Sequence, residues 1–182
     1  MLWGAEGGIE VSEILDSGTR REFGTGAVRD VQEGKGRCDL MPLDVLAEYY
    51  SEHHALCPHI GMVFESLHRF MTTGDTAHLF AALRWFRVPG HYERSETMFL
   101  ELAKHYEAGA VKYGERNWEK GIPVHCYIDS AVRHLLKFIR GDDDEPHDRA
   151  FVWNVVGAIW TVNHRPGMMD IPIKEDNDNG EN

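Results

Sequence analysis

The sequence predicts an all-α protein folded as a helical bundle. Apolar residues recur at helical spacing through most of the chain, and no segment shows the strict alternation of a half-buried strand. Proline and glycine residues stand where several of these periodic segments begin and end. With 182 residues, 42% of them hydrophobic, the chain can bury one substantial core.

The chain is expected to divide into three parts. Residues 1–34 form an irregular N-terminal arm, because glycines recur throughout it and no periodic pattern is sustained. Residues 35–173 form a single helical domain. Residues 174–182 form an acidic, Asn-rich tail that we expect to be disordered.

Two helices within residues 60–90 are interpreted as an elaboration of the bundle. Gly74 and Asp75 separate them, and Pro89 and Gly90 end the pair. The sequence predicts a homo-oligomer built through these helices, because they hold more aromatic side chains than one small bundle should expose. These aromatic residues are Phe64, Phe70, Phe80, Trp85 and Phe86.

Three further helices follow this pair. One begins at the N-cap Ser95 and is closed by Gly114, which suits the position after a helix end. The next begins after Pro123, and the last begins at Pro146, a favourable first helical residue. The last helix is expected to be buried, since only Asn154 is polar in its middle.

Charge and cysteine usage narrow the class of protein. The formal net charge of −11 argues against binding a DNA or RNA duplex or an anionic membrane surface, since both require basic patches. The three cysteines form no CxxC motif and indicate a reducing compartment. No apolar run approaches the length of a membrane span, and no signal-peptide pattern opens the chain. We therefore expect a cytoplasmic protein.

A turn rich in glycine and cations precedes the first helix of the domain. Gly34 and Gly36 allow close approach to the backbone, and Lys35 and Arg37 can reach phosphate oxygens. The run ends in Asp39 and lacks the frame of a Walker loop. It is either a phosphate-binding turn or a solvated basic turn before a helix.

Acidic residues on three helices could converge in a bundle and hold a divalent metal. Mg²⁺ prefers carboxylate oxygens and substrate phosphates as ligands. The acids are Glu107, Asp129 and one of Asp144, Glu145 and Asp148. Other residues would complete a nucleotide site: Lys112, Arg133, Lys35 and Arg37 would neutralise phosphates, Tyr113 or Trp118 would stack on a base, and Asn117 or Asn154 would bond its edge.

Structural roles for several of these residues stay open from the sequence. Asp129 and Arg133 are spaced as an i,i+4 ion pair worth about 0.2–0.5 kcal/mol. His134 fits a core histidine bonded to a backbone carbonyl, and the acids before Pro146 suit the positive end of a helix dipole. Asn154 either ties helices together or reads a ligand.

Several short motifs stand together in two runs of the chain. The runs are GTGAVRDVQEGKGRCDLMPLDVLAEY and HYEAGAVKYGERNWEKGIPVHCYIDSAVRHLLKFIRGDDDEPHDRAFVWN. With these runs the chain resembles the dATP/dGTP diphosphohydrolases, a family abundant in phages and prophages and grouped with the MazG-like, all-α nucleoside triphosphate pyrophosphohydrolases. The resemblance covers about residues 23–164, apart from the elaboration at 60–95.

This resemblance implies a MazG-like bundle whose domain over residues 35–173 is catalytic. It implies Mg²⁺- or Mn²⁺-dependent cleavage of a purine deoxynucleoside triphosphate to the monophosphate and pyrophosphate. Lys112, Arg133, His134 and His147 match the family pattern directly. The expected residues are Glu107, Asp129, His134 and His147 for catalysis; Glu107, Asp129, Glu145 and Asp148 for the metal; and Lys35, Arg37, Asp39, Lys112, Tyr113, Asn117, Trp118, Arg133 and Asn154 for the substrate.

Two other functions fit parts of the sequence. His147-Asp148 is an HD pair, with His105 or His134 upstream and Asp170 downstream, as in HD phosphohydrolases that release triphosphate from dGTP. A non-catalytic nucleotide-binding protein is the other alternative, because the paired-glutamate pattern of MazG enzymes is incomplete here. The reaction product separates the two enzyme classes, since one releases pyrophosphate and the other releases inorganic triphosphate.

Overall fold

The computed structural model describes residues 18–32, 35–52, 58–86 and 95–171. The expectations for most of the N-terminal arm (residues 1–17 and 33–34) and for the tail at 174–182 lie outside these ranges. Within them the protein is mostly helical, and the predicted all-α class is confirmed. A two-stranded sheet is the one addition to that class in the described residues.

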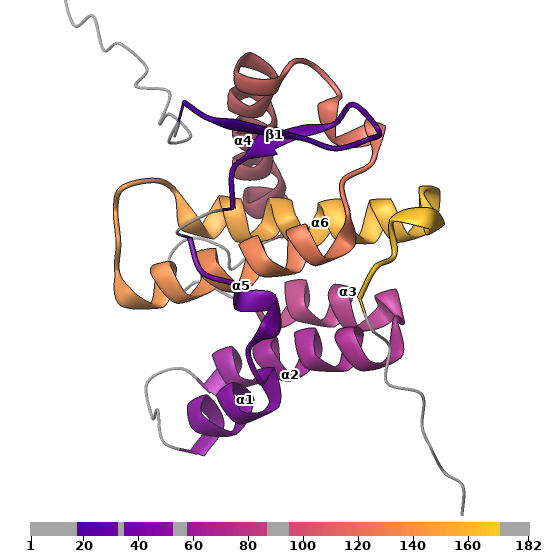
Figure 1. Ribbon diagram of the computed structural model, residues 1–182. Helices are drawn as coiled ribbons and strands as arrows, with labels where there is room; N and C mark the ends of the chain where they lie inside the picture. Colours follow the sequence, from indigo (N-terminus) through magenta and orange to yellow (C-terminus); the bar gives the residue numbers. More distant parts are fainter. Residues whose placement is uncertain (1–17, 33–34, 53–57, 87–94, 172–182) are drawn as a thin grey trace, which may run out of the picture.

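The helices form three layers (Figure 1). Helices α5 (Val124–Arg140) and α6 (His147–His164) pack on each other across the middle. Helix α4 (Ser95–Tyr113) and the small sheet lie on one side of this pair. Helices α1 (Leu43–Glu52), α2 (Pro58–Thr73) and α3 (Thr76–Trp85) lie on the other. Three 3₁₀ turns complete the described elements: η1 (Cys38–Leu40), η2 (Asn117–Lys120) and η3 (Pro166–Met168).

Local residues set most helix ends where the sequence places them. The Asp75 side chain caps α3 by accepting a hydrogen bond from the Ala77 N–H at 2.8 Å. Gly114 ends α4 with φ of 89°, and Gly141 ends α5 with φ of 85°, a region that glycine adopts without a Cβ clash. Helix α6 is buried between the layers as expected, and no helix of the described ranges is long and apolar enough to cross a membrane.

The described part of the N-terminal arm is a β-hairpin, which corrects the expectation of an irregular arm there. Strands β1 (Arg20–Glu22) and β2 (Val28–Asp30) pair antiparallel. Strands of three residues are too short to show an alternating pattern in the sequence. Tertiary contacts hold the hairpin instead, since the Asn117 side-chain amide donates to the Val28 carbonyl at 2.9 Å and accepts from the Val28 N–H at 3.0 Å.

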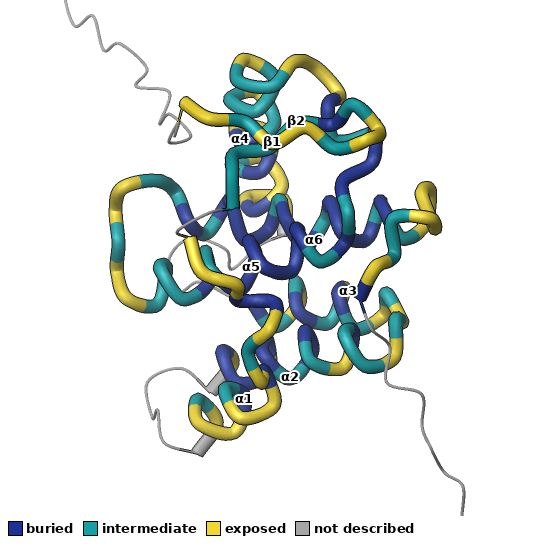
Figure 2. The backbone as a smooth tube through the Cα atoms, in the orientation of Figure 1, coloured by how far each residue is buried: buried dark blue, intermediate teal, exposed yellow. Residues whose placement is uncertain are grey.

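Most aromatic residues of the 58–86 helices face the protein's own core (Figure 2). Phe64, Phe70 and Phe86 are buried, and Phe86 packs on Phe151 of α6 with ring centroids 4.4 Å apart. Phe80 is 56% exposed. The premise that these aromatics exceed what one bundle can cover is therefore wrong for most of them, and the homo-oligomer stays a prediction.

Gly157 lets α6 approach α5 closely, and we expect its replacement to be costly. A Cβ at this position would lie 2.4 Å from the Cε1 atom of Tyr127. Gly157→Ala should lower the free energy of unfolding by about 1–3 kcal/mol through overpacking. Gly109→Ala on α4 is the matched control, because nothing lies within 4 Å of its Cβ position. The control should gain roughly 0.5–1 kcal/mol from helix propensity. Urea unfolding of both variants measures the contrast, and equal stabilities would contradict it.

Candidate functional site

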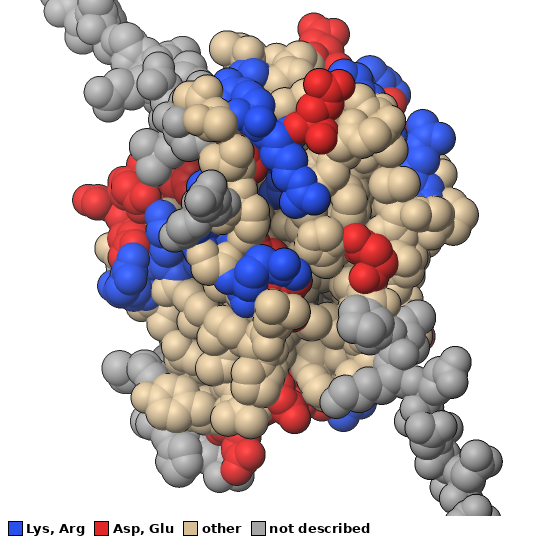
Figure 3. Space-filling view, in the orientation of Figure 1, with Lys and Arg blue, Asp and Glu red and all other residues tan. Residues whose placement is uncertain are grey.

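A cavity of about 990 Å³ lies between the hairpin, α4 and the α5–α6 pair. The hairpin contributes Arg21 and Arg29, and the following segment contributes Lys35. Helix α5 contributes Arg133 and Lys137. Figure 3 shows Lys and Arg side chains gathered over the hairpin, although the whole chain carries a net charge of −11. The cavity is thus a local concentration of cations, as an anionic ligand requires.

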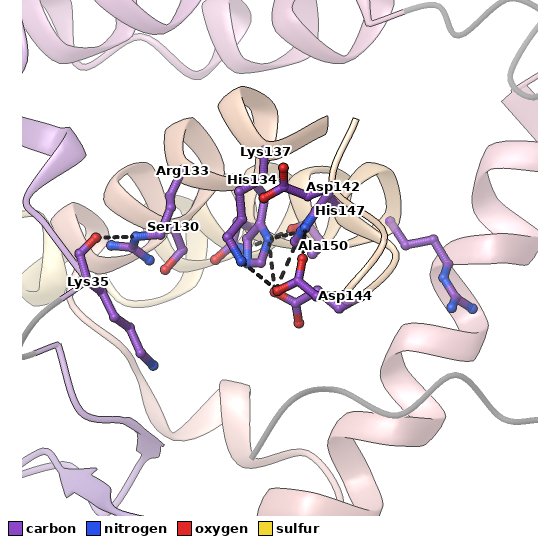
Figure 4. Close-up of polar contacts among 12 residues, drawn as sticks. Lys35, Ser130, Arg133, His134, Lys137, Asp142, Asp144, His147 and Ala150 are labelled. Atoms are coloured by element: carbon purple, nitrogen blue, oxygen red, sulfur yellow. Dashed lines mark hydrogen bonds and ion pairs between the residues drawn. The ribbon is translucent and has the colours of Figure 1, made fainter. Parts of the chain in front are cut away.

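Two histidines and a glutamate meet at one edge of this cavity. The Nδ1 atoms of His134 and His147 are 3.1 Å apart. The Glu145 Oε1 atom lies 3.4 Å from the first and 3.6 Å from the second. In Figure 4 the two imidazoles lie side by side with the Asp144 carboxylate next to them. His134 comes from α5, while Glu145 and His147 flank the start of α6, so the α5–α6 turn brings the three together.

Asp144 fixes the orientation of the His147 ring. Its Oδ1 atom lies 2.7 Å from His147 Nε2, and its Oδ2 atom accepts a hydrogen bond from Lys137 Nζ at 2.8 Å. A carboxylate at Nε2 favours the tautomer in which Nε2 carries the proton and Nδ1 keeps its lone pair. That lone pair then faces His134 and Glu145. Asp142, Asp144 and His147 form a second close group of donor atoms.

His134 is neutral at physiological pH. Burial lowers the pKa of the His134 imidazole well below its usual range, and the neighbouring His147 lowers it further. A neutral imidazole keeps a lone pair that can bind a metal, whereas an imidazolium cannot.

The donor set of this cluster fits a divalent transition metal. Two donors each about 2.1 Å from one ion lie roughly 3–3.5 Å apart, which is close to the separations seen among His134, Glu145 and His147. Imidazole nitrogens suit transition metals such as Zn²⁺, whereas Mg²⁺ prefers oxygen ligands. Of the two ions expected from the sequence, Mn²⁺ is the transition metal.

The structure does not gather the other three expected metal ligands here. Glu107 is exposed and lines the cavity, but it belongs to neither donor group among the described residues. Asp148 accepts a hydrogen bond from the Arg149 N–H and also lies outside both groups. Asp129 is 1% exposed, and its oxygens accept from the Cys38 N–H and from Gln32 Nε2. Of the expected metal ligands Glu107, Asp129, Glu145 and Asp148, the one that belongs to a close donor group in the described residues is Glu145.

Residues expected to bind phosphates are mostly engaged with the protein. Arg133 pairs with Asp129 and donates to the Lys35 carbonyl at 3.0 Å, so it holds the turn at residues 35–36 in place. Lys35 lines the cavity, with its Nζ atom 3.7 Å from Asp30 Oδ2. Arg37 pairs with Asp39, and neither side chain lines the cavity. Of these cations, Lys35 and Arg133 remain next to a ligand that enters the cavity.

Most of the expected substrate-binding residues on α4 and η2 are likewise engaged with the protein. Lys112 Nζ donates to Asp30 at 2.9 Å, and Tyr113 OH donates to the same carboxylate at 3.1 Å. Both amide atoms of Asn117 are used by the backbone of β2. Trp118 lines the cavity but packs edge-on against Tyr106, at 5.6 Å between ring centroids, and against Trp160, at 4.8 Å. These contacts make Lys112 and Asn117 anchors of the hairpin.

Asn154 holds an arginine. Its Oδ1 atom accepts a hydrogen bond from Arg29 Nη2 at 2.9 Å, and its Nδ2 atom donates to the Ala150 carbonyl at 2.8 Å. Each end of the amide therefore already has a protein partner. These contacts favour the structural alternative for Asn154.

Asn154→Ala is accordingly expected to act on stability. Removing the amide takes away one of the two hydrogen-bond acceptors of Arg29 Nη2 and leaves Ser130 Oγ as the other, which should lower the free energy of unfolding by about 1–3 kcal/mol. The ranking of purine over pyrimidine substrates should not change. Asn163→Ala, on the exposed side of the same helix, is the matched control and should stay within about 0.5 kcal/mol of wild type. A changed base preference in a fully stable Asn154→Ala protein would restore Asn154 to a reading role.

A comparison with known protein families covers the helices that carry the two donor groups. The model of a family described as dATP/dGTP diphosphohydrolase, N-terminal, matches residues 94–171. Over these residues the chain is similar to that family. The match confirms the resemblance inferred from the sequence and contains α4, α5, α6 and all members of both donor groups. No curated protein and no solved structure matches the chain.

The name of the dATP/dGTP diphosphohydrolases implies a hydrolase that acts on a nucleotide, and such a family implies a divalent metal. Two cavity residues missed by the sequence reasoning lie outside the matched segment. These are Asp30, the acceptor for Lys112 and Tyr113, and Arg29. Both stand on β2, a strand that the periodicity did not reveal. The Arg-Asp pair within the run GTGAVRDVQ, which was quoted for the family resemblance, is the sequence signal that could have identified them.

Proposed function

We propose that the protein is a metal-dependent deoxynucleoside triphosphate diphosphohydrolase that cleaves dATP or dGTP to the monophosphate and pyrophosphate. One observation carries this proposal: the His134, Glu145 and His147 donor atoms converge within 3.6 Å at the edge of a cavity lined by cations. A polyphosphate needs both features, since cations bind its oxygens and a metal supports its hydrolysis. The family match supports the same reaction.

His134, Glu145 and His147 would hold the metal, and Mn²⁺ is the ion we propose. A divalent ion bound there would neutralise charge on the phosphates and lower the pKa of a bound water. Asp144 keeps the His147 ring in the tautomer that presents Nδ1. Lys35, which lines the same cavity, would attract the substrate, although it also faces an acid.

The remaining features of the proposal concern the molecule as a whole. We propose that residues 35–173 act as one catalytic domain, with the 60–90 helices as an elaboration on the side of α6 away from the cavity. A cytoplasmic location and a purine deoxynucleotide as partner follow from the reaction. A homo-oligomer remains part of the proposal, with exposed Phe80, Tyr49 and Val45 as the apolar side chains on this elaborated side.

The test is to identify the products. Purified protein is incubated with each of the four deoxynucleoside triphosphates and Mn²⁺ or Mg²⁺, and phosphorus NMR distinguishes pyrophosphate from triphosphate. We expect the monophosphate and pyrophosphate, faster with Mn²⁺ than with Mg²⁺, and no turnover in EDTA. Release of inorganic triphosphate, or full turnover in EDTA, would contradict the proposal.

Of the HD phosphohydrolase set, the geometry brings His134 to within 3.1 Å of His147 but gathers none of the other members there in the described residues. His147 belongs to the cluster, but Asp148 faces the Arg149 N–H. His105 packs against Trp153, and Asp170 pairs with His125 at 2.5 Å. These members of the expected HD set are therefore not assembled around His147 in the described residues.

A further inference from the structure

We infer that Arg21 and Arg29, opposite each other on the hairpin, form the binding site for the polyphosphate of the substrate. The identity of that anion rests on the proposed function, whereas the anion site itself rests on the hairpin. Neither arginine was singled out by the sequence reasoning, and both lie outside the segment that matches the family.

The hairpin places two like charges against each other. In the register of β1 and β2, Arg21 is the direct partner of Arg29. Side chains at such positions stand on the same face of the sheet with their Cβ atoms about 4.5–5.5 Å apart, and like charges there are destabilising. Both side chains line the cavity. An anion between them turns this repulsion into two attractive contacts.

The same two arginines are the cavity cations without an acidic partner. Among the described residues that line the cavity, the other Lys and Arg side chains each form an ion pair: Lys35 with Asp30, Arg116 with Glu119, Arg133 with Asp129, and Lys137 with Asp144. Arg21 and Arg29 are in no ion pair within the described residues. Their charges are therefore the ones available to compensate a polyphosphate.

Arg29 is held rigidly by uncharged groups. Its Nη2 atom donates to Ser130 Oγ at 3.1 Å and to Asn154 Oδ1 at 2.9 Å. The guanidinium carbon lies 5.2 Å from the Tyr127 ring centroid and 5.6 Å from that of Trp153. The Nη1 atom is buried and has no hydrogen-bond partner among the described residues. A buried charged donor without a partner is costly, so the site is arranged for an acceptor that the protein does not supply.

The position of Arg29 suits a phosphate next to the metal ligands. Ser130 precedes His134 by four residues on α5, which is one helical turn or roughly 6 Å along the axis. Arg29 therefore lies about one turn from the His134–Glu145–His147 cluster. Two aromatic rings already face its guanidinium, which leaves the edge of the group for hydrogen bonds and disfavours stacking of a base. We therefore assign it to the phosphates.

Binding of inorganic triphosphate, measured by calorimetry in EDTA, tests the arginines without metal or base. Arg29→Gln should weaken binding roughly 10- to 100-fold, because a charge-assisted hydrogen bond contributes about 1.5–3 kcal/mol. Arg29→Lys should fall between wild type and Arg29→Gln, since the charge stays and the fork is lost. Arg21→Gln should also weaken binding, and its melting temperature without ligand should equal or exceed that of wild type because the repulsion is removed.

Arg20→Gln is the matched control. It removes the same charge from the same strand, but Arg20 is paired with Asp30 and does not line the cavity. It should leave triphosphate binding unchanged. Circular dichroism confirms that each variant is folded, and if Arg29→Gln does not fold, Arg29→Lys and Arg21→Gln carry the test.

Three results would overturn the inference. They are a wild type that does not bind millimolar triphosphate, a folded Arg29→Gln protein that binds it normally, and an Arg20→Gln protein weakened as much as Arg21→Gln. A changed dATP-to-dGTP preference with normal triphosphate binding would likewise replace the phosphate role by base reading. Triphosphate binding that depends on both arginines in a protein that turns over no deoxynucleotide supports the anion site and contradicts the proposed function.

Discussion

His147→Ala is expected to abolish turnover of dATP and dGTP and to remove high-affinity Mn²⁺ binding. His147 presents Nδ1 to the His134 and Glu145 donor atoms, and Asp144 orients it from the other side of the ring. Loss of a residue that only supports a ligand costs about 10- to 100-fold in metal affinity or activity, so loss of the ligand itself should exceed about 100-fold. Calorimetry with Mn²⁺ measures the binding, and product release measures kcat.

The same helix offers a control for this result. His164 is exposed at the end of α6, stacked on Trp160 with ring centroids 4.7 Å apart, and is far along the helix from the cluster. His164→Ala should keep both metal affinity and activity. Asp144→Asn should show an intermediate loss, because it removes the carboxylate that selects the His147 tautomer. A His147→Ala protein that binds Mn²⁺ as wild type does would remove the cluster as the metal site.

Asp129→Ala is expected to destabilise the protein by about 3–5 kcal/mol, the cost of leaving one partner of a buried ion pair alone. The Asp129 carboxylate is 1% exposed, pairs with Arg133, and accepts a hydrogen bond from the Cys38 N–H at 2.6 Å. It therefore attaches η1 and the turn at residues 35–36 to α5. Chemical denaturation measures the loss, and activity should fall through unfolding.

A surface pair with the same spacing is the control for Asp129. Glu65 and Arg69 on α2 form an i,i+4 ion pair at 2.6 Å, but their side chains are 34% and 60% exposed. Glu65→Ala should cost no more than about 1 kcal/mol. Mn²⁺ affinity of the folded fraction distinguishes the two roles of Asp129: it should be retained in Asp129→Ala, and its loss in a folded protein would support the ligand role inferred from the sequence.

The sequence by itself determined the helical class and most helix boundaries. Gly114, Asp75 and the prolines before α5 and α6 act through the backbone of their own neighbours, so their effect can be read without knowing the fold. The lone polar residue Asn154 in an apolar helix, and the family resemblance carried by His134 and His147, also pointed to α5 and α6 as parts of the candidate site. The N-terminal hairpin escaped this reasoning because short strands depend on distant partners such as Asn117.

Tertiary structure alone decided which polar residues are engaged by the protein and which face a ligand. Asp129, Asn117 and Asn154 have the residue types of a binding site, but partners far away in the sequence use their hydrogen-bonding atoms. Glu145 was an expected metal ligand from the sequence, but its two imidazole neighbours come from the α5–α6 turn. Arg29 stands in the cavity because β2 docks there. The position of a residue along a helix determines on which face of the helix its side chain lies. Packing between elements determines which groups that face contacts.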